Sequence, residues 1–322
     1  MTPSVQGPGT APHTEVAPAA DSGFVLVSVL WLLALLTVIT LVLLTTIRLD
    51  VRGAGQLARH AEAEALADGL ARLVALRLGD RFRRPLAPNT ITADGNPYTC
   101  SHEQALVEIT VTDVGGLVDL NMASVRLLEW LLLGLGLAAD RAAAMAAAIV
   151  DFRDEDDLPG PNGAEAAAYH AAGLQHGPKN APFESVTELD QVLGMDLALF
   201  ARLRGVTTVH SRQPGIDPTK AAPELRAIAT AIPNSEVPTT SGARERTRIP
   251  PEFRAASRGR AFRVTVRVAL ARGGRFGREA VIEPVRTAPL GFVLREWTLS
   301  LPVAAPVDPV PANHEPCLSA LL

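Results

Sequence analysis

The sequence predicts an α+β fold: a long N-terminal membrane-spanning helix that continues onto a small antiparallel sheet, with a large all-α domain inserted. Three observations predict it. The run Phe24–Ile47 carries no ionisable side chain. Strand-like segments lie on both sides of residues 117–210. Residues 117–210 are themselves rich in Ala and Leu in a helical pattern, which indicates helices packed against one another.

The apolar run Phe24–Ile47 is long enough to cross a bilayer as a helix. At a rise of ~1.5 Å per residue it extends about 36 Å, and the hydrocarbon core of a bilayer is ~30 Å thick. The apolar part of a cleaved secretory signal is shorter, ~7–15 residues, and follows a basic stretch. No Lys or Arg precedes Phe24. The run therefore predicts an N-terminal membrane anchor, and residues 1–22, rich in Pro, Thr, Ala and Gly, are expected to be disordered.

After the anchor, a helix is expected to continue from Arg48 to Leu78, with leucines mostly three or four residues apart on one face. Such a stripe must be buried, and a small sheet is its natural partner. Strands are expected at Ala105–Asp113, Phe262–Val268, Arg278–Val285 and Phe292–Leu299, with Gly273-Gly274 as a hairpin turn. The alternation in Phe262–Val268 predicts one buried face and one solvated face that carries arginines.

The expected inserted domain, residues 117–210, holds more than twice as many acidic as basic side chains. Ser124 is expected to cap a first helical hairpin; Ser185 and Glu188 form a capping box in a second, and Asp196 caps its next helix. Paired short helices of this kind resemble helix-hairpin-helix modules, so the alternative function is a membrane-anchored, competence-type DNA-binding protein. The acidic module and the net charge of −4 argue against it, because phosphate contacts need Lys and Arg.

A cluster of carboxylates follows the helix that is expected to end near Arg153. It comprises Asp154, Glu155, Asp156, Asp157 and, beyond a Pro/Gly/Asn loop, Glu165. Like charges at a helix C-terminus repel one another and oppose the helix dipole. Calcium removes that penalty, because it binds carboxylate and carbonyl oxygens at ~2.3–2.6 Å. The spacing is not that of an EF-hand loop, so the cluster fits either a calcium site or a solvated acidic loop.

Catalytic patterns are missing from the sequence. The seven histidines are scattered, no Gly-rich phosphate loop follows a strand, and no Ser or Cys nucleophile motif occurs. We therefore expect no catalytic residues and no enzyme. The two cysteines, Cys100 and Cys317, are too few for a disulfide framework, and Cys317 lies in a Pro-rich tail, so two isolated thiols are favoured over a bond.

Several ordered motifs carry a resemblance to a known family. Gly23-Phe24 followed by VLVSVLWLLALLTVITLVLL resembles the processing junction and N-terminal helix of type IV pilin-like proteins. Four downstream strings resemble the K-type minor pseudopilins of the type II (general) secretion pathway: LVDLNMASVRLLEWLLLGLG, AIVDFRDEDDLPGPNGAEAAAY, PKNAPFESVTELDQVLGM and GVTTVHSRQPGIDPTKAAPELRAI. The resemblance spans about Ser22 to Trp297, which is most of the chain.

The resemblance implies the pseudopilin fold and a place in a short periplasmic filament. Prepilin peptidase would remove the leader between Gly23 and Phe24 and methylate Phe24. The implied partners are the I- and J-type minor pseudopilins, then the H-type and major pseudopilins, the inner-membrane secretion platform and exported proteins, but no nucleic acid. The resemblance also implies calcium on the acidic loop. It implies a single-pass inner-membrane protein with its bulk in the periplasm, although Arg48 and Arg52 alone would favour the opposite orientation.

Ser28 would be the fifth residue of the mature chain. Most pilin-like subunits carry Glu there, which pairs with a neighbour's terminal amine. A subunit without that carboxylate suits the end of the filament, so the resemblance implies a tip position that starts assembly. The expected organisation is a leader (1–23), a transmembrane helix (24–47), a spine helix with the first strands (48–116), the inserted domain (117–210), the rest of the sheet domain (211–300, with a flexible loop at 233–251) and a tail (301–322).

Overall fold

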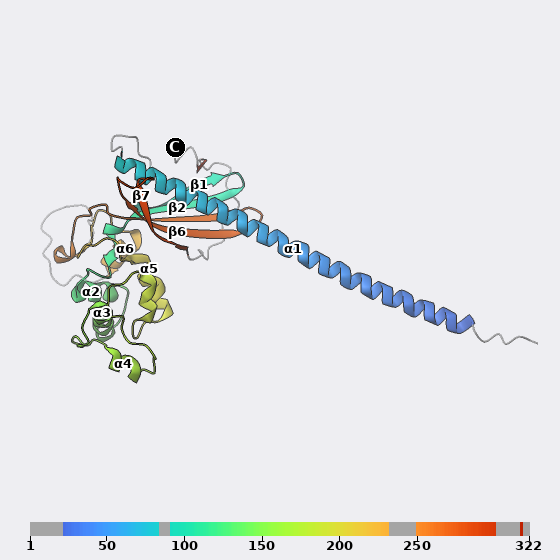
Figure 1. Ribbon diagram of the computed structural model, residues 1–322, viewed down its shortest axis with the longest axis horizontal. Coiled ribbons are helices and arrows are strands. Elements are labelled where there is room, and N and C mark those ends of the chain that lie inside the picture. Colours follow the sequence, from blue (N-terminus) through green and yellow to red (C-terminus); the bar gives the residue numbers. More distant parts are fainter. Residues whose placement is uncertain (1–21, 84–90, 232–248, 301–315, 318–322) are drawn as a thin grey trace, which may run out of the picture. The chain divides into compact units, whose positions relative to one another are not determined.

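The computed structural model of the chain describes residues 22–83, 91–231, 249–300 and 316–317 (Figure 1). The expected leader before Ser22, most of the loop 233–251 and most of the tail 301–322 lie outside these residues. The chain divides into two compact units, Met1–Ala58 and Arg59–Leu322.

The first unit contains the N-terminal part of helix α1 (Ser22–Arg83), which is one continuous helix of 62 residues. Within it, Phe24–Thr45 is long and apolar enough to cross a membrane, and its side chains are exposed. An apolar helix whose side chains are exposed fits a single-pass membrane anchor. The predicted anchor is therefore present as a single helix.

The second unit contains an antiparallel sheet in the order β1-β2-β5-β6-β7. Its strands are β1 (Asp94–His102), β2 (Ala105–Asp113), β5 (Phe262–Leu270), β6 (Arg275–Pro284) and β7 (Phe292–Leu299). The central pair β2–β5 joins strands from the two ends of the insertion, with Thr110 opposite Thr265. Gly273 and Gly274 have φ of 83° and 109° and form the predicted turn between β5 and β6. The α+β prediction is thus confirmed.

The C-terminal part of α1 packs on this sheet and forms the sheet core. Ala63, Ala67 and Ala71 are fully buried, and these small side chains let the helix approach the strands closely. Val264 and Val266 of β5 meet the helix from the sheet. β1 was not predicted as a strand, since Gly95, Asn96 and Pro97 disfavour strands; its place at the edge of the sheet tolerates them.

The predicted solvated face of Phe262–Val268 is wrong for Arg263, which is only 9% exposed. Arg278 of β6 is also buried, at 7% exposed, but on the opposite face of the sheet. Arg278 lies on the face covered by α1, where its guanidinium pairs with Asp68 (2.6 Å) and Glu64 (3.1 Å) of that helix. Arg263 donates to backbone carbonyls of the inserted segment. Alternation marks two faces of a strand, but it does not say that a second layer of structure covers the polar one.

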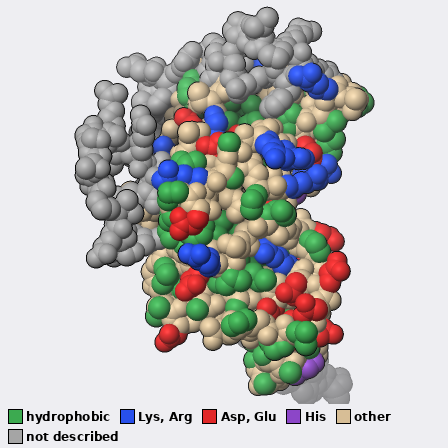
Figure 2. Space-filling model, turned by 90° about the vertical axis from the view of Figure 1, so that its left-hand side faces the viewer, with side chains coloured by type: hydrophobic (Ala, Val, Ile, Leu, Met, Phe, Trp, Pro, Cys, Tyr) green, Lys and Arg blue, Asp and Glu red, His purple; other side chains and the backbone are tan. Residues whose placement is uncertain are grey.

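The insertion folds into what we call the helical module, which the structure describes over residues 114–231 and 249–253. It contains η1 (Val114–Gly116), β3 (Val118–Asp119), α2 (Val125–Gly134), α3 (Ala139–Arg153), α4 (Ala166–Ala171), η2 (Val186–Gln191), α5 (Leu197–Val206), β4 (Thr207–Thr208), α6 (Pro223–Ala231) and η3 (Pro251–Phe253). The short parallel pair β3–β4 ties the beginning of the module to the end of α5. Figure 2 shows acidic side chains gathered on the lower part of the molecule.

The predicted caps of the module are present. Ser124 and Asp196 accept the backbone N–H groups of Leu127 and Leu199. Ser185 and Glu188 form the capping box, although the helix they begin, η2, is a short 3₁₀ helix. The helix-hairpin-helix likeness of the two hairpins stays a prediction.

The helical core extends past the predicted boundary at residue 210. Ile216, Leu225, Ile228, Ile249 and Phe253 belong to the same buried cluster as α2, α3 and α5. Residues 211–253 were expected to belong to the sheet domain because the Ala- and Leu-rich helical pattern ends near His210. In the structure α6 packs on α2 and α5, so the described part of this stretch completes the helical module.

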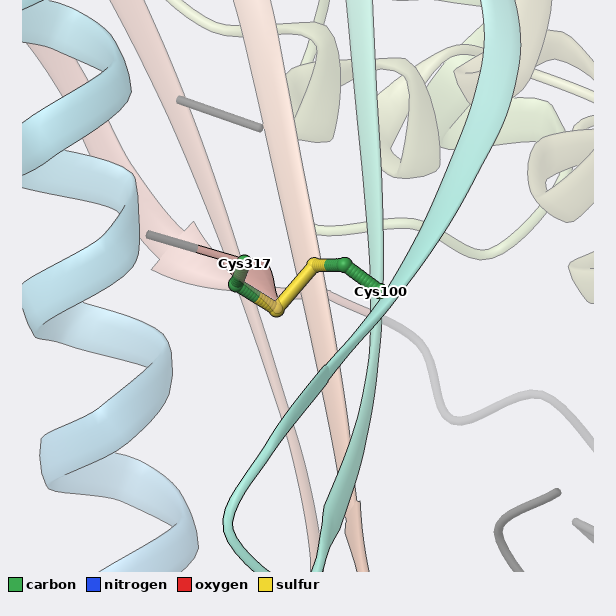
Figure 3. Close-up of a disulfide and its surroundings, with 2 residues drawn as sticks. All are labelled: Cys100 and Cys317. Atoms are coloured by element: carbon green, nitrogen blue, oxygen red, sulfur yellow. A yellow bond between two sulfur atoms is a disulfide. The ribbon is translucent and has the colours of Figure 1, made fainter. Parts of the chain in front are cut away.

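Cys100 and Cys317 form a disulfide, which corrects the expectation of two isolated thiols (Figure 3). Their Cα atoms are 5.0 Å apart, and both residues are fully buried. The two cysteines are 217 positions apart, and the sequence gave no sign of their proximity, because only the fold brings Cys317 back to β1.

Candidate metal centre

The acidic loop between α3 and α4 is anchored at both sides by backbone contacts. The guanidinium of Arg153, in the last turn of α3, donates to the carbonyls of Leu120 and Ala123. Asp154 is the C-cap of α3, and its N–H donates to the carbonyl of Val150. At the far end, Glu165 is the residue before α4. Both ends of the loop therefore have fixed positions.

Asp151 organises the loop from inside α3. It is 3% exposed, and its carboxylate accepts the N–H groups of Gly160 (3.2 Å) and Ala164 (2.8 Å). A Cβ on Gly163 would overlap the same carboxylate, so a side chain there would force the loop away. Sequence reasoning missed Asp151 because it lies within the helix. The available signal was its spacing of three residues before Asp154, which places both on one helix face.

Three of the five predicted carboxylates come together. One oxygen each of Asp154, Asp156 and Glu165 lies within 4.8 Å of the other two. Two oxygens bound to one calcium at ~2.4 Å can be at most about 4.8 Å apart. The distances between these three oxygens are therefore compatible with one shared calcium ion, without a change in the conformation of the loop.

The buried oxygens of this group are unsatisfied. Among the described residues, Oδ1 of Asp154 and both carboxylate oxygens of Glu165 are buried without a hydrogen-bond partner. Glu165 is only 6% exposed. An unpaired buried carboxylate costs free energy, so an oxygen-only group of this kind is suited to a hard divalent cation such as calcium.

Burial and the neighbouring negative charges shift the pKa values of two carboxyl groups in this loop. Burial raises the pKa of Asp154, and the negative charges of Asp151 and Asp156 raise it further. The pKa of Glu165 is raised first by burial and then by the neighbouring carboxylates, of which Asp151 has the largest effect. A bound cation would instead lower the pKa values of these carboxyl groups, because it favours their charged forms.

The other two predicted ligands lie differently. Glu155 is exposed and does not belong to the group. Asp157 accepts a hydrogen bond from Nδ2 of Asn180 (2.7 Å). Asn180 has a φ of 50°, and its N–H donates to the carbonyl of Phe152, which holds it beside the loop. Its own Oδ1 is buried without a partner. Asn180 is a further oxygen donor at the loop that its place in the sequence did not indicate.

The residues of the predicted processing junction lie in the first unit. Gly23 and Phe24 are in the first turn of α1, and the Phe24 side chain is 78% exposed. The hydroxyl of Ser28 donates to the carbonyl of Val25 (2.9 Å), which is the inexpensive backbone bond expected of Ser in an apolar helix. The roles of these residues in processing and filament position stay predictions.

Comparison with known proteins finds a similarity that covers much of the helical module. Residues 107–212 match the family model of "Type II secretion system (T2SS), protein K". This region of the chain is therefore similar to protein K of type II secretion systems. The matched region begins in β2 and ends just after β4, so it contains the candidate metal centre and the capped helices of the helical module.

Two curated relatives are both named type II secretion system protein K. The one from Pectobacterium carotovorum subsp. carotovorum is 38% identical over 73 residues, which is 23% of this chain and 22% of the relative. The one from Klebsiella pneumoniae is 41% identical over 78 residues, 24% of this chain and 23% of the relative. The chain thus spans less than a quarter of the length of the curated relatives in these matches.

A solved structure also matches. The crystal structure of the GspK-GspI-GspJ complex from the type 2 secretion system of enterotoxigenic Escherichia coli aligns over 79% of this chain and 99% of that chain. The TM-score is 0.48 and the sequence identity is 18%.

Proposed function

We propose that this chain is a protein K of the type II secretion system, a minor pseudopilin at the tip of its pseudopilus. It starts filament assembly and supports the export of folded proteins from the periplasm across the outer membrane. The family match of the helical module carries the proposal. The apolar segment Phe24–Thr45 of α1 adds to it, since it is long enough to cross a membrane, as the anchor of a pseudopilin would.

The proposed partners are other pseudopilins. The Escherichia coli protein was solved in a complex with GspI and GspJ, and we propose the I- and J-type minor pseudopilins as direct partners here. The H-type and major pseudopilins would follow below the tip, on the inner-membrane secretion platform, and exported proteins would meet the exposed module. This role needs neither catalysis nor nucleic acid. None of the relatives above supports the DNA-binding alternative.

We place the chain in the inner membrane with its bulk in the periplasm. The single apolar segment Phe24–Thr45 provides the anchor. The buried Cys100–Cys317 disulfide supports an oxidising compartment for the second unit, because disulfides form and persist in the periplasm and are rare in the cytosol.

Calcium is the proposed ligand of the acidic loop. The buried, unpartnered oxygens of Asp154 and Glu165 and their closeness to Asp156 support it. Bound calcium would stabilise the loop between α3 and α4 and thereby the surface that the module presents. It has no chemical role in this proposal.

N-terminal mass spectrometry of the protein from membranes tests the pseudopilin assignment. With prepilin peptidase present, the chain is expected to begin with methylated Phe24; without it, the leader stays attached. Gly23→Ala is expected to block both processing and secretion. The matched control is Gly53→Ala, another glycine of α1, where a new Cβ meets nothing within 4 Å, so processing should be normal. An intact N-terminus with the peptidase present would contradict the assignment.

A further inference from the structure

One stretch of the chain, which leads into β5 and β6, is strongly basic. Residues 253–278 hold eight arginines and neither Asp nor Glu, although the formal net charge of the chain is −4. Three of these arginines are accounted for by the fold. Arg263 and Arg278 are buried, and Arg267 pairs with a glutamate of β2 at 2.6 Å. The part of the stretch before β5 carries three more arginines, and the proposed function uses none of them.

This part, residues 254–260, has its arginines on one side. Arg254, Ala256 and Arg258 are exposed, and the residues between them are half-buried. Alternate side chains of an extended chain face opposite sides, so the two arginines face outward together. The backbone N–H of Arg258 donates to Oε1 of Gln213 (3.2 Å), which places the segment beside the stretch that follows β4.

The inward side of the segment is held by a buried polar network. The N–H of Ser257 donates to Oδ2 of Asp217 (2.7 Å), and its hydroxyl lies 2.8 Å from both carboxylate oxygens of Asp113. Asp113 and Asp217 are only 4% and 8% exposed. Their carboxylates accept hydrogen bonds from Ser257 on the inward side, and the segment thereby has a fixed backbone.

A fourth arginine joins these three from the stretch after β4. Arg212 is exposed and directly precedes Gln213, the residue that accepts the N–H of Arg258. We call the four residues the arginine patch: Arg212, Arg254, Arg258 and Arg260. Within the described part of the chain, no member of the patch has an Asp or Glu oxygen within 4.0 Å. The patch therefore gathers positive charge that its described surroundings do not pair.

We infer that the arginine patch is a docking surface for an acidic segment of another protein. A guanidinium group binds a carboxylate through two parallel N–H···O bonds, so several arginines on a fixed backbone suit a row of Asp or Glu side chains. Because the backbone is already held, less conformational freedom is lost on binding. The inference depends on the contacts of the patch and does not rest on the proposed secretion role.

The charge of the rest of the unit favours a protein over a longer polyanion. The helical module holds more than twice as many acidic as basic side chains over residues 117–210. Nucleic acid or an anionic membrane would extend beyond the patch and meet this negative charge. A short acidic segment can contact the patch alone.

Fluorescence anisotropy with a labelled hexaglutamate peptide tests the docking surface, with the full chain in detergent at low salt. The peptide is expected to bind, and hexaglutamine, an uncharged peptide of the same length, is not. Arg258→Gln should weaken binding roughly fivefold, and Arg258→Gln combined with Arg212→Gln more than about tenfold. Added salt should also weaken binding, because it screens exposed charges.

The matched control is Arg272→Gln. Arg272 is an exposed arginine of the same basic stretch, but it lies in the turn at the far end of β5, so hexaglutamate should bind within about twofold of the wild type. Failure of hexaglutamate to bind would overturn the inference, as would equal losses in Arg258→Gln and Arg272→Gln. Single-stranded DNA or phosphatidylglycerol vesicles that bind more tightly than the peptide, and lose binding in Arg258→Gln, would show that the patch takes a polyanion instead of an acidic protein.

Discussion

Glu165 and Asp154 show how single buried carboxylates respond to the fold. Both pKa values are raised, so the metal-free folded chain holds these protons more tightly than the unfolded chain does. Their contribution to stability is full below the unfolded pKa, near 4, and is lost as the pH rises through the raised value. In a chelator, this part of the stability should therefore decline from about pH 4 upward.

Urea unfolding at pH steps between about 4 and 7, with chelator present, checks this. Glu165→Gln removes one of the two raised carboxyl groups and should flatten the decline. Glu155→Gln is the matched control, because Glu155 is an exposed carboxylate of the same loop. The stability of this variant should depend on pH as that of the wild type does. The same slope in Glu165→Gln as in the wild type would contradict the account.

At the scale of elements, the loop between α3 and α4 should respond to calcium. A ligand that binds only the folded state at 100 times its Kd adds about 2.7 kcal/mol. For a unit of this size, that corresponds to a rise in melting temperature of roughly 5–10 °C. Chelation should reverse the rise, and Asp154→Asn or Glu165→Gln should abolish it.

Differential scanning calorimetry with and without calcium measures this shift. Glu155→Gln again serves as the control and should keep the full response, since Glu155 lies outside the carboxylate group. An unchanged transition in the wild type would remove the calcium proposal and leave a solvated acidic loop.

At the scale of the whole molecule, side chains of the sheet join the sheet core to the helical core. Arg263 of β5 donates to the carbonyls of Arg204, Gly205 (both 3.3 Å) and Thr207 (2.6 Å), at the end of α5. Nearby, His210 contacts Glu296 of β7 at 2.7 Å. Because Arg263 is buried, these bonds are shielded from water and bear on how firmly the two cores are joined.

Arg263→Met should lower the free energy of unfolding by about 2–3 kcal/mol, since buried carbonyls lose a charged donor. The control is Arg295→Met, which breaks a more exposed pair with Glu283 and should cost less than about 1 kcal/mol. Urea unfolding followed by tryptophan fluorescence reads both cores, because Trp130 lies in the helical core and Trp297 packs on the sheet core. If the two variants lower the free energy of unfolding equally, the bonds of Arg263 do not hold the two cores together.

Local patterns in the sequence determined much of this protein. The uncharged run Phe24–Ile47 predicted the anchor, the strands at Ala105–Asp113 and Phe292–Leu299 have the predicted bounds, and the caps at Ser124 and Asp196 are where the pattern placed them. These features depend on residues close together in the chain, where period, propensity and capping act directly.

Only the tertiary structure decided the features that join distant segments. It buried Arg263 under the helical module, added α6 to the helical core, wrapped the acidic loop around Asp151 and brought Cys317 back to Cys100. Each depends on which surfaces meet after folding. Local sequence does not carry that information, because a buried face and a solvated face follow the same alternation until a second layer covers one of them.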